Sequence, residues 1–142
     1  MTRHAFILMA GLLAVHRDAS AETSQVSSFP IRQELGVLSM NGWPVAGKAP
    51  TLFVTTRGDG FGGYGSTGCN SWSASVTFSE PDQIAVGGAK VTGIGCPLTV
   101  LQAERTFLEA IARPLRWRRE HGRLVLENDG NKLMLAPVFQ QR

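Results

Sequence analysis

Histidine, cysteine and tyrosine are scarce in this chain of 142 residues, which holds three histidines, two cysteines and one tyrosine. Charged residues are also few, at 18% of the sequence, and the formal net charge is only +3. So small a charge gives no reason to expect a nucleic-acid or membrane-surface partner. The few soft ligands include no Cys-x-x-Cys pair, so a structural zinc site is not expected. We expect no metal, no cofactor and no nucleic-acid partner.

Long apolar runs are also missing, apart from one at the N-terminus. Two basic residues precede an unbroken apolar run over residues 5–15, and Ala19-Ser20-Ala21 follows as the small-x-small pattern of a signal-peptidase site. A run of that length spans about 16 Å as a helix, too little for a hydrocarbon core of roughly 30 Å. No cysteine precedes Cys69, so no lipid anchor is expected. We predict a signal peptide over residues 1–21, no stable membrane anchor, and a mature protein that is periplasmic or secreted.

The segment after the predicted cleavage site, residues 22–34, is polar, serine-rich and interrupted by Pro30, so we expect a flexible lead. Beyond it, alternating or β-branched runs between turn residues predict antiparallel strands. Asn41-Gly42 is a strong hairpin signal, and the glycine-rich residues 58–63 and Gly87-Gly88 are predicted turns. The predicted strands cover residues 35–40, 43–45, 51–56, 72–78, 83–86, 89–92, 115–120, 123–128 and 132–137.

One helix is predicted, from Pro97 to about Arg113. Apolar residues recur there at steps of three and four, as on the buried face of an amphipathic helix. Proline suits the first turn of a helix, and Pro114 ends this one. The pattern therefore predicts an antiparallel β protein with a single helix.

The only two cysteines, Cys69 and Cys96, each end a short glycine-containing segment. In an exported chain, two cysteines indicate one disulfide. The bond would enclose 26 intervening residues and stabilise the fold by about 3–4 kcal/mol in the chain-entropy model. Two separate buried thiols are the alternative, because free cysteine is itself a small apolar core residue.

The segments around the two cysteines resemble the META domain family, whose bacterial members include HslJ-like envelope proteins. The residues that carry the resemblance are Asn41-Gly42, Gly65-Ser66-Thr67-Gly68-Cys69-Asn70, Thr92-Gly93-Ile94-Gly95-Cys96-Pro97, the helix residues Glu104, Phe107 and Leu108, and Leu124-Val125-Leu126. Two departures are that Leu35 and Ile94 stand where the family often has tryptophan and methionine. A third is that this chain lacks the lipid-accepting cysteine of many HslJ-like members.

The resemblance implies a META-like domain over residues 35–138 with an α+β fold. Its expected form is a strongly bent, half-barrel-like antiparallel sheet of about seven or eight strands packed around one α-helix. It also implies structural roles for the motif residues, which are Gly68, Cys69, Asn70, Thr92 and Cys96. It implies no activity, because the family has no established common chemistry.

Several patterns suggest catalysis, but each lacks a necessary part. Gly58-x-Gly60-x-x-Gly63 matches the dinucleotide fingerprint, yet no helical pattern follows to hold a pyrophosphate. Ser66 lacks the Gly-x-Ser-x-Gly context of a hydrolase nucleophile. His121, the one histidine outside the signal segment, stands at an expected hairpin turn, where a solvated role is favoured.

Charged pairs give no catalytic site either. Glu80 and Asp82 flank a proline in an expected turn, and Glu104 and Glu109 share a helix but not a face, so neither pair converges as acid–base catalysis requires. In residues 116–119 the arginines on either side of the tryptophan point away from it in a strand, which predicts an exposed cationic strand face.

We therefore expect a non-enzymatic, monomeric domain of the cell envelope with a binding or stress-related maintenance role. Its expected partner is a protein or a small apolar ligand of the envelope. One alternative is a module with a pocket for an apolar molecule or lipid where the sheet meets the helix. Another is an envelope protease inhibitor or hydrolase acting through residues 58–68. Direct packing of Trp72 on Phe107 would argue against the pocket, and an open cleft with two converging polar groups would favour an enzyme.

Overall fold

The computed structural model describes residues 28–79 and 81–141, so the predicted signal peptide, residues 22–27 of the expected lead, and Glu80 lie outside the described residues. Neither helix within the described part of the chain is long and apolar enough to cross a membrane. The elements, in chain order, are β1 (Leu35–Met40), β2 (Trp43–Pro44), β3 (Thr51–Arg57), β4 (Gly60–Ser66), β5 (Ser71–Ser79), β6 (Gln83–Val91), α2 (Leu98–Ile111), β7 (Leu115–Glu120), β8 (Arg123–Glu127), β9 (Lys132–Pro137) and the 3-10 helix η1 (Val138–Gln141).

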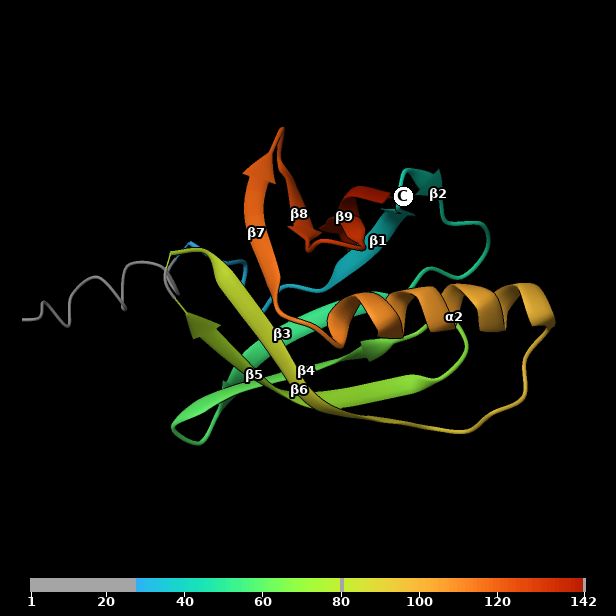
Figure 1. The fold of residues 1–142 in the computed structure, drawn as a ribbon, viewed down its shortest axis with the longest axis horizontal. Coiled ribbons are helices and arrows are strands. Elements are labelled where there is room, and N and C mark those ends of the chain that lie inside the picture. Colours follow the sequence, from blue (N-terminus) through green and yellow to red (C-terminus); the bar gives the residue numbers. More distant parts are fainter. Residues whose placement is uncertain (1–27, 80, 142) are drawn as a thin grey trace, which may run out of the picture.

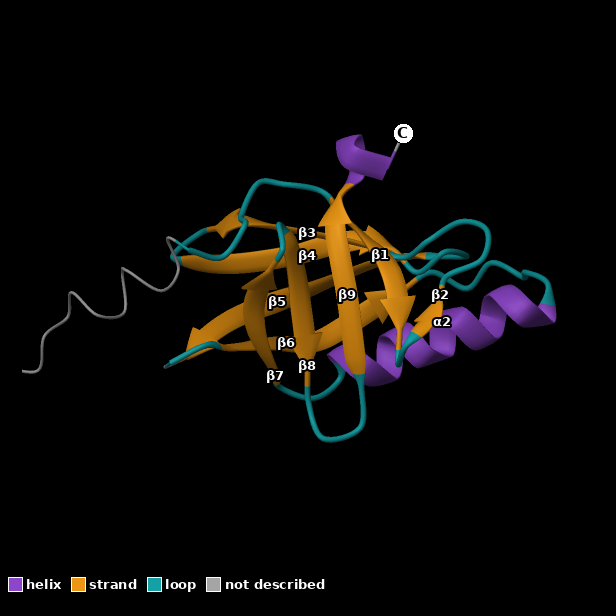
Figure 2. Ribbon diagram, turned by 90° about the horizontal axis from the view of Figure 1, so that it is seen from above, coloured by secondary structure: helices purple, strands orange, loops and turns teal. Residues whose placement is uncertain are grey.

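Eight of the strands form a closed antiparallel barrel (Figure 2). The strand order is β1-β3-β4-β5-β6-β7-β8-β9, and β9 pairs back with β1; β2 is a short extra strand on the end of β1. Leu35 shows how the barrel closes, because it pairs with Leu52 on one side and with Pro137 on the other. The expected α+β class with one α-helix is confirmed, whereas the half-barrel is wrong because both edges of β1 are used.

Two pairings in the barrel are short. β6 meets β7 only at Gln83↔Arg116 and Ile84↔Leu115, and β1 meets β3 only at Leu35↔Leu52 and Gly36↔Thr51. The strands diverge beyond these points and leave an opening. The α-helix α2 follows β6 in the chain and lies between the β3–β6 part of the barrel and the part formed by β1 and β9 (Figure 1).

The helix fills this opening with apolar side chains. Phe107, Ala110 and Ile111 are buried in the same core cluster as the inward-facing residues of the strands. Trp72 of β5 packs directly on Phe107, with ring centroids 5.8 Å apart, and both side chains are at most 3% exposed. Close packing leaves no space for a guest at this point. The packing therefore argues against an apolar pocket in the barrel interior, where sheet and helix meet.

The glycine-rich segment predicted as a turn is mostly a strand. Only Gly58 and Asp59 form the turn, and β4 runs from Gly60 to Ser66. A Cβ atom at Gly63 would lie 3.2 Å from the indole of Trp72, and one at Gly65 would lie 2.0 Å from the backbone oxygen of Thr51. Glycine is therefore required at these positions because neighbouring strands approach too closely for a side chain. Local sequence does not reveal this cause.

The expected turn at Gly87-Gly88 is also wrong, because β6 is continuous through it. One extra residue of β6 is accommodated as a bulge, at the register shift where Ser73 pairs with Lys90 and Ser75 pairs with Gly87. The other strands lie within two residues of their predicted ends. The helix begins at Leu98, one residue later than expected, because Pro97 is its N-cap.

Part of the expected flexible lead packs against the barrel. Phe29 is only 2% exposed and contacts the rings of Phe78 and Trp117 at centroid distances of 5.0 and 5.5 Å. The backbone N–H of Arg32 also donates to the oxygen of Val54, at 2.7 Å. The expectation is therefore wrong for this part of residues 22–34, because the side chain of Phe29 and the backbone of Arg32 anchor it.

The cationic strand face has the expected arrangement. Trp117 packs inward, while Arg116 and Arg118 are exposed and form ion pairs with acidic residues. These partners are Asp82 for Arg116, and Glu120 and Glu127 for Arg118. The arginines therefore have partners within this chain.

Replacing Gly65 by alanine should destabilise the fold by about 3 kcal/mol, because the added methyl group meets the backbone of the neighbouring strand and the backbone must move. Gly60→Ala in the same strand is the control, since its nearest non-neighbouring atom is 4.0 Å from the new Cβ. Urea denaturation measures both. Equal stability of the two variants would contradict the crowding argument.

Candidate functional site

Asn70 joins three segments of the chain in one buried polar junction. Its side chain is 4% exposed, and its Nδ2 donates to Glu104 Oε2 of α2 at 2.8 Å. Its Oδ1 accepts from the hydroxyl of Thr92 at 3.0 Å and from the backbone N–H of Ile94 at 2.6 Å. One amide therefore ties the loop after β4 to the helix and to the segment after β6.

Thr67 completes the junction. It is fully buried, its hydroxyl donates to Glu104 Oε2, and its Oγ1 accepts from the backbone N–H groups of Asn70 and Cys69 at 2.7 and 3.2 Å. Throughout the described residues, every buried side-chain nitrogen and oxygen has a hydrogen-bond partner. A buried network with all its partners is stabilising, whereas each partner lost leaves a group that is costly to bury.

Glu104 is the member of this junction that the predicted site lacks. Hydrogen bonding by Thr67, and to a smaller extent by Asn70, lowers the pKa of Glu104 below its ordinary 4.5, against the opposing effect of burial. The sequence contains a signal for this placement, because Glu104 stands three residues before the buried Phe107 and so shares its side of the helix. The junction therefore stabilises the charged form of this carboxylate.

A disulfide joins Cys69 and Cys96, whose Cα atoms are 6.1 Å apart. This pairing agrees with the predicted bond and excludes the alternative of two separate thiols. Cys96 directly precedes Pro97, the N-cap residue of α2, and the helix has neither a side-chain cap nor an acidic residue in its first turn. The covalent bond therefore holds the start of a helix that lacks the usual N-terminal stabilisation.

Gly68 supports a further segment, the connection between β2 and β3. Its φ is +94°, and a Cβ there would lie 2.7 Å from the backbone oxygen of Lys48. Glycine is required both by this left-handed conformation and by the close approach. The motif loop therefore lies against Lys48 on one side and is hydrogen-bonded to α2 on the other.

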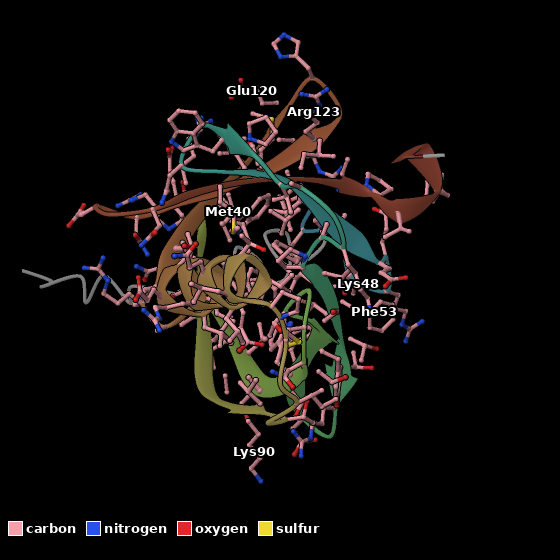
Figure 3. The ribbon with its side chains drawn as sticks, turned by 90° about the vertical axis from the view of Figure 1, so that its right-hand side faces the viewer. Met40, Lys48, Phe53, Lys90, Glu120 and Arg123 are labelled. Atoms are coloured by element: carbon pink, nitrogen blue, oxygen red, sulfur yellow. A yellow bond between two sulfur atoms is a disulfide. The ribbon has the colours of Figure 1, made fainter. Side chains whose placement is uncertain are left out.

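A surface cleft of about 450 Å³ lies between these two supported segments. The end of β1, β2 and the following loop form one wall, and the first turns of α2 form the other. Trp43 is 78% exposed, whereas Met40 is buried and lies between the helix and the strands above it (Figure 3). The lining residues are Met40, Asn41, Trp43, Pro44, Val45, Ala46, Lys48, Thr99, Val100, Ala103 and Thr106.

Lys48 is the only titratable residue in this lining. Asn41 is already engaged, since its Nδ2 donates to Asn131 Oδ1 at 3.2 Å and its Oδ1 accepts from the N–H of Lys132 at 2.8 Å. The hydroxyl of Thr106 donates to the backbone oxygen of Gln102, at 3.1 Å. Among the described residues that line the cleft there is therefore no pair of titratable side chains for acid–base catalysis.

The other residues considered for catalysis lie elsewhere. His121 is exposed in the turn between β7 and β8, with φ +50°. Ser66 accepts the N–H of Gly68 on its Oγ, at 2.9 Å. Across residues 28–79 and 81–141, no group of three histidine, cysteine, aspartate or glutamate side chains is placed to hold a metal ion.

The family profile of the META domain matches residues 33–138. A search of the curated proteins gives no match. Two solved structures are similar. One, described only as an NMR structure of a protein, is 18% identical with a TM-score of 0.62 and covers 78% of this chain and 92% of its own. The other, an NMR structure of a protein from Burkholderia xenovorans, is 16% identical with a TM-score of 0.61 and covers 96% and 98%. These likenesses show the fold alone.

Stability should fall in acid because of Glu104. Its folded-state pKa lies below the ordinary 4.5, so its contribution is complete above that value and is lost as the pH falls through the folded-state pKa. Glu104→Gln should lower stability by about 1 kcal/mol at neutral pH and flatten the acid dependence, because Thr67 and Asn70 lose a charged acceptor.

Urea denaturation at several pH values measures this, with the exposed Glu109→Gln on the same helix as the control. A Glu104→Gln profile parallel to that of the wild type would show that the carboxylate does not contribute.

Proposed function

The chain belongs to the META domain family, and we propose that it is an exported, monomeric, non-enzymatic binding domain whose ligand site is the cleft between β2 and α2. The observation that carries this proposal is the indole of Trp43. It is 78% exposed and lines a cleft whose side chains are mostly apolar. The proposed ligand is a small apolar molecule of the cell envelope.

The shape and lining of the cleft support binding. Its volume of about 450 Å³ lies within the range of roughly 300–1,000 Å³ typical of small-molecule sites. Val45 and Ala103 are partly buried and pack on the core, so the cleft walls are continuous with the rigid interior. An exposed tryptophan at such a site offers a large apolar surface, which a ligand would remove from water.

The chemistry of the lining supports binding rather than catalysis. Lys48 is the only ionisable group of the lining, and two of its three uncharged polar side chains, Asn41 and Thr106, already have partners. A hydrolase would need a nucleophile and a base within hydrogen-bond reach of each other. The cleft therefore acts by binding a ligand and not by converting it.

Two features support export to the periplasm or the cell exterior. The first is the apolar run followed by Ala19-Ser20-Ala21. The second is the disulfide between Cys69 and Cys96, since such bonds persist in oxidising compartments.

N-terminal sequencing of protein from the envelope fraction tests export directly. The mature chain should begin at Glu22, because the small-x-small pattern ends at Ala21. A soluble protein that keeps Met1 would contradict export by this signal.

Filling the cleft should abolish binding. Ala103→Trp places a large side chain in the wall formed by α2, and should weaken the binding of a neutral apolar dye such as Nile red at least tenfold. Gln102→Trp adds the same side chain at an exposed neighbouring position outside the lining, and should leave binding unchanged. Dye fluorescence and thermal unfolding are measured on both variants. Equal dye affinity in two folded variants would mean that this cleft is not the site.

A further inference from the structure

Resting on the proposed function of the cleft, we propose that the ligand is an anionic amphiphile, a single acyl chain that ends in a carboxylate. The chain lies against Trp43, Val45 and Val100, and the carboxylate pairs with the ammonium of Lys48. Three observations lead to this class: the charge of the lining, the state of its polar groups, and the proline in β2.

The charge of the cleft has one sign. Lys48 is its only charged residue, and the ion pairs of the described residues involve Arg116 and Arg118 but not Lys48. A ligand that ends in a carboxylate can make a charge-assisted hydrogen bond with this ammonium. A wholly apolar ligand cannot make this bond.

The start of α2 adds to the same field. The first turn contains no acidic residue, and Thr99 from this turn lines the cleft. The positive end of the helix dipole is therefore not neutralised by the helix itself. The helix dipole therefore adds to the preference for an anionic ligand that Lys48 creates.

The polar groups of the cleft suit an acyl chain better than a peptide. A bound peptide would bring backbone N–H and C=O groups that need partners. The side chains of Asn41 and Thr106 are already bonded within the protein, which leaves Thr99 and Lys48 as the polar side chains of the lining that a peptide could use. β2 has only two residues, and Pro44 has no N–H to donate to an added strand. An acyl chain makes no such demand.

The apolar contacts suit a flexible chain. Met40 lies at the base of the cleft, and its unbranched thioether side chain can adjust to ligands of different length. The indole of Trp43 covers one side, and Val100 and Ala103 of α2 form the other. The charged end of the ligand then lies at Lys48, which is exposed to solvent.

The test uses Trp43 as the reporter, with dodecanoate and dodecanol as probes below their aggregation concentrations. Trp72 is buried and Trp117 packs against the core, so a blue shift of tryptophan emission that disappears in Trp43→Phe reports burial of Trp43. Dodecanoate should bind about tenfold more tightly than dodecanol at low salt. Added sodium chloride should reduce this difference, because salt screens an exposed charge pair.

Substitutions at Lys48 then locate the carboxylate. Lys48→Gln should weaken dodecanoate binding five- to tenfold and leave dodecanol binding unchanged, whereas Lys48→Arg should keep most of the affinity because it keeps the charge. Lys90→Gln is the matched control, since Lys90 is exposed, is not among the residues that line the cleft, and projects at the bottom of the view in Figure 3.

The outcomes separate this inference from the proposed function. If neither probe changes the emission of Trp43, the proposed function itself fails. If both probes bind equally and Lys48→Gln changes neither, the cleft is an apolar site and the anionic class is wrong. If a short apolar peptide displaces dodecanoate at a lower concentration than dodecanoate itself requires, a peptide is the ligand and the acyl-chain assignment is overturned.

Discussion

The side-chain amide of Asn70 is the contact on which the position of the helix depends. Its donor is used on Glu104, and its acceptor is shared by Thr92 and the backbone of Ile94. No short apolar side chain could make these bonds, and removing the amide would leave the carboxylate of Glu104, the hydroxyl of Thr92 and the N–H of Ile94 with fewer partners. A small part of the chain thereby fixes the relation between the loop after β4, the segment after β6, and α2.

The barrel explains why this constraint is needed. A ladder of backbone hydrogen bonds aligns most strands, but β6 and β7 share only two residue pairs, and α2 occupies the opening that follows. Packing of Phe107 and Ile111 holds the inner face of the helix, and the junction with the disulfide holds its start. The adjoining side of the first turns, with Val100 and Ala103, then forms the cleft wall. The site therefore follows from the incomplete pairing of the sheet.

Local sequence predicts the features that depend on local causes. The alternation in β5, the hairpin signal Asn41-Gly42 and the spacing of apolar residues in α2 each indicate an element that the structure contains. The disulfide and the motif residues follow from the context of the two cysteines and from the family resemblance. The predictions of strand, hairpin and helix hold because the periodicity and the turn chemistry act within a few residues.

The missed features depend on contacts between distant segments. The glycines of β4 indicate a turn in the sequence, but Trp72 and Thr51 on neighbouring strands require them. Closure of the barrel depends on β1 meeting β9, about a hundred residues later in the chain. The cleft combines residues near position 45 with residues near position 100 and has no local pattern of its own.

Residue-resolved amide hydrogen exchange in Asn70→Ala tests most directly the claim that the motif junction holds both walls of the cleft. The indicative amides are Leu101, which donates to Pro97, and Val45, which donates to Leu38. The account predicts that their exchange increases at least about tenfold more than that of the β8 and β9 amides, because local opening precedes global unfolding. An increase confined to residues 67–70, or an equal increase throughout the barrel, would contradict it.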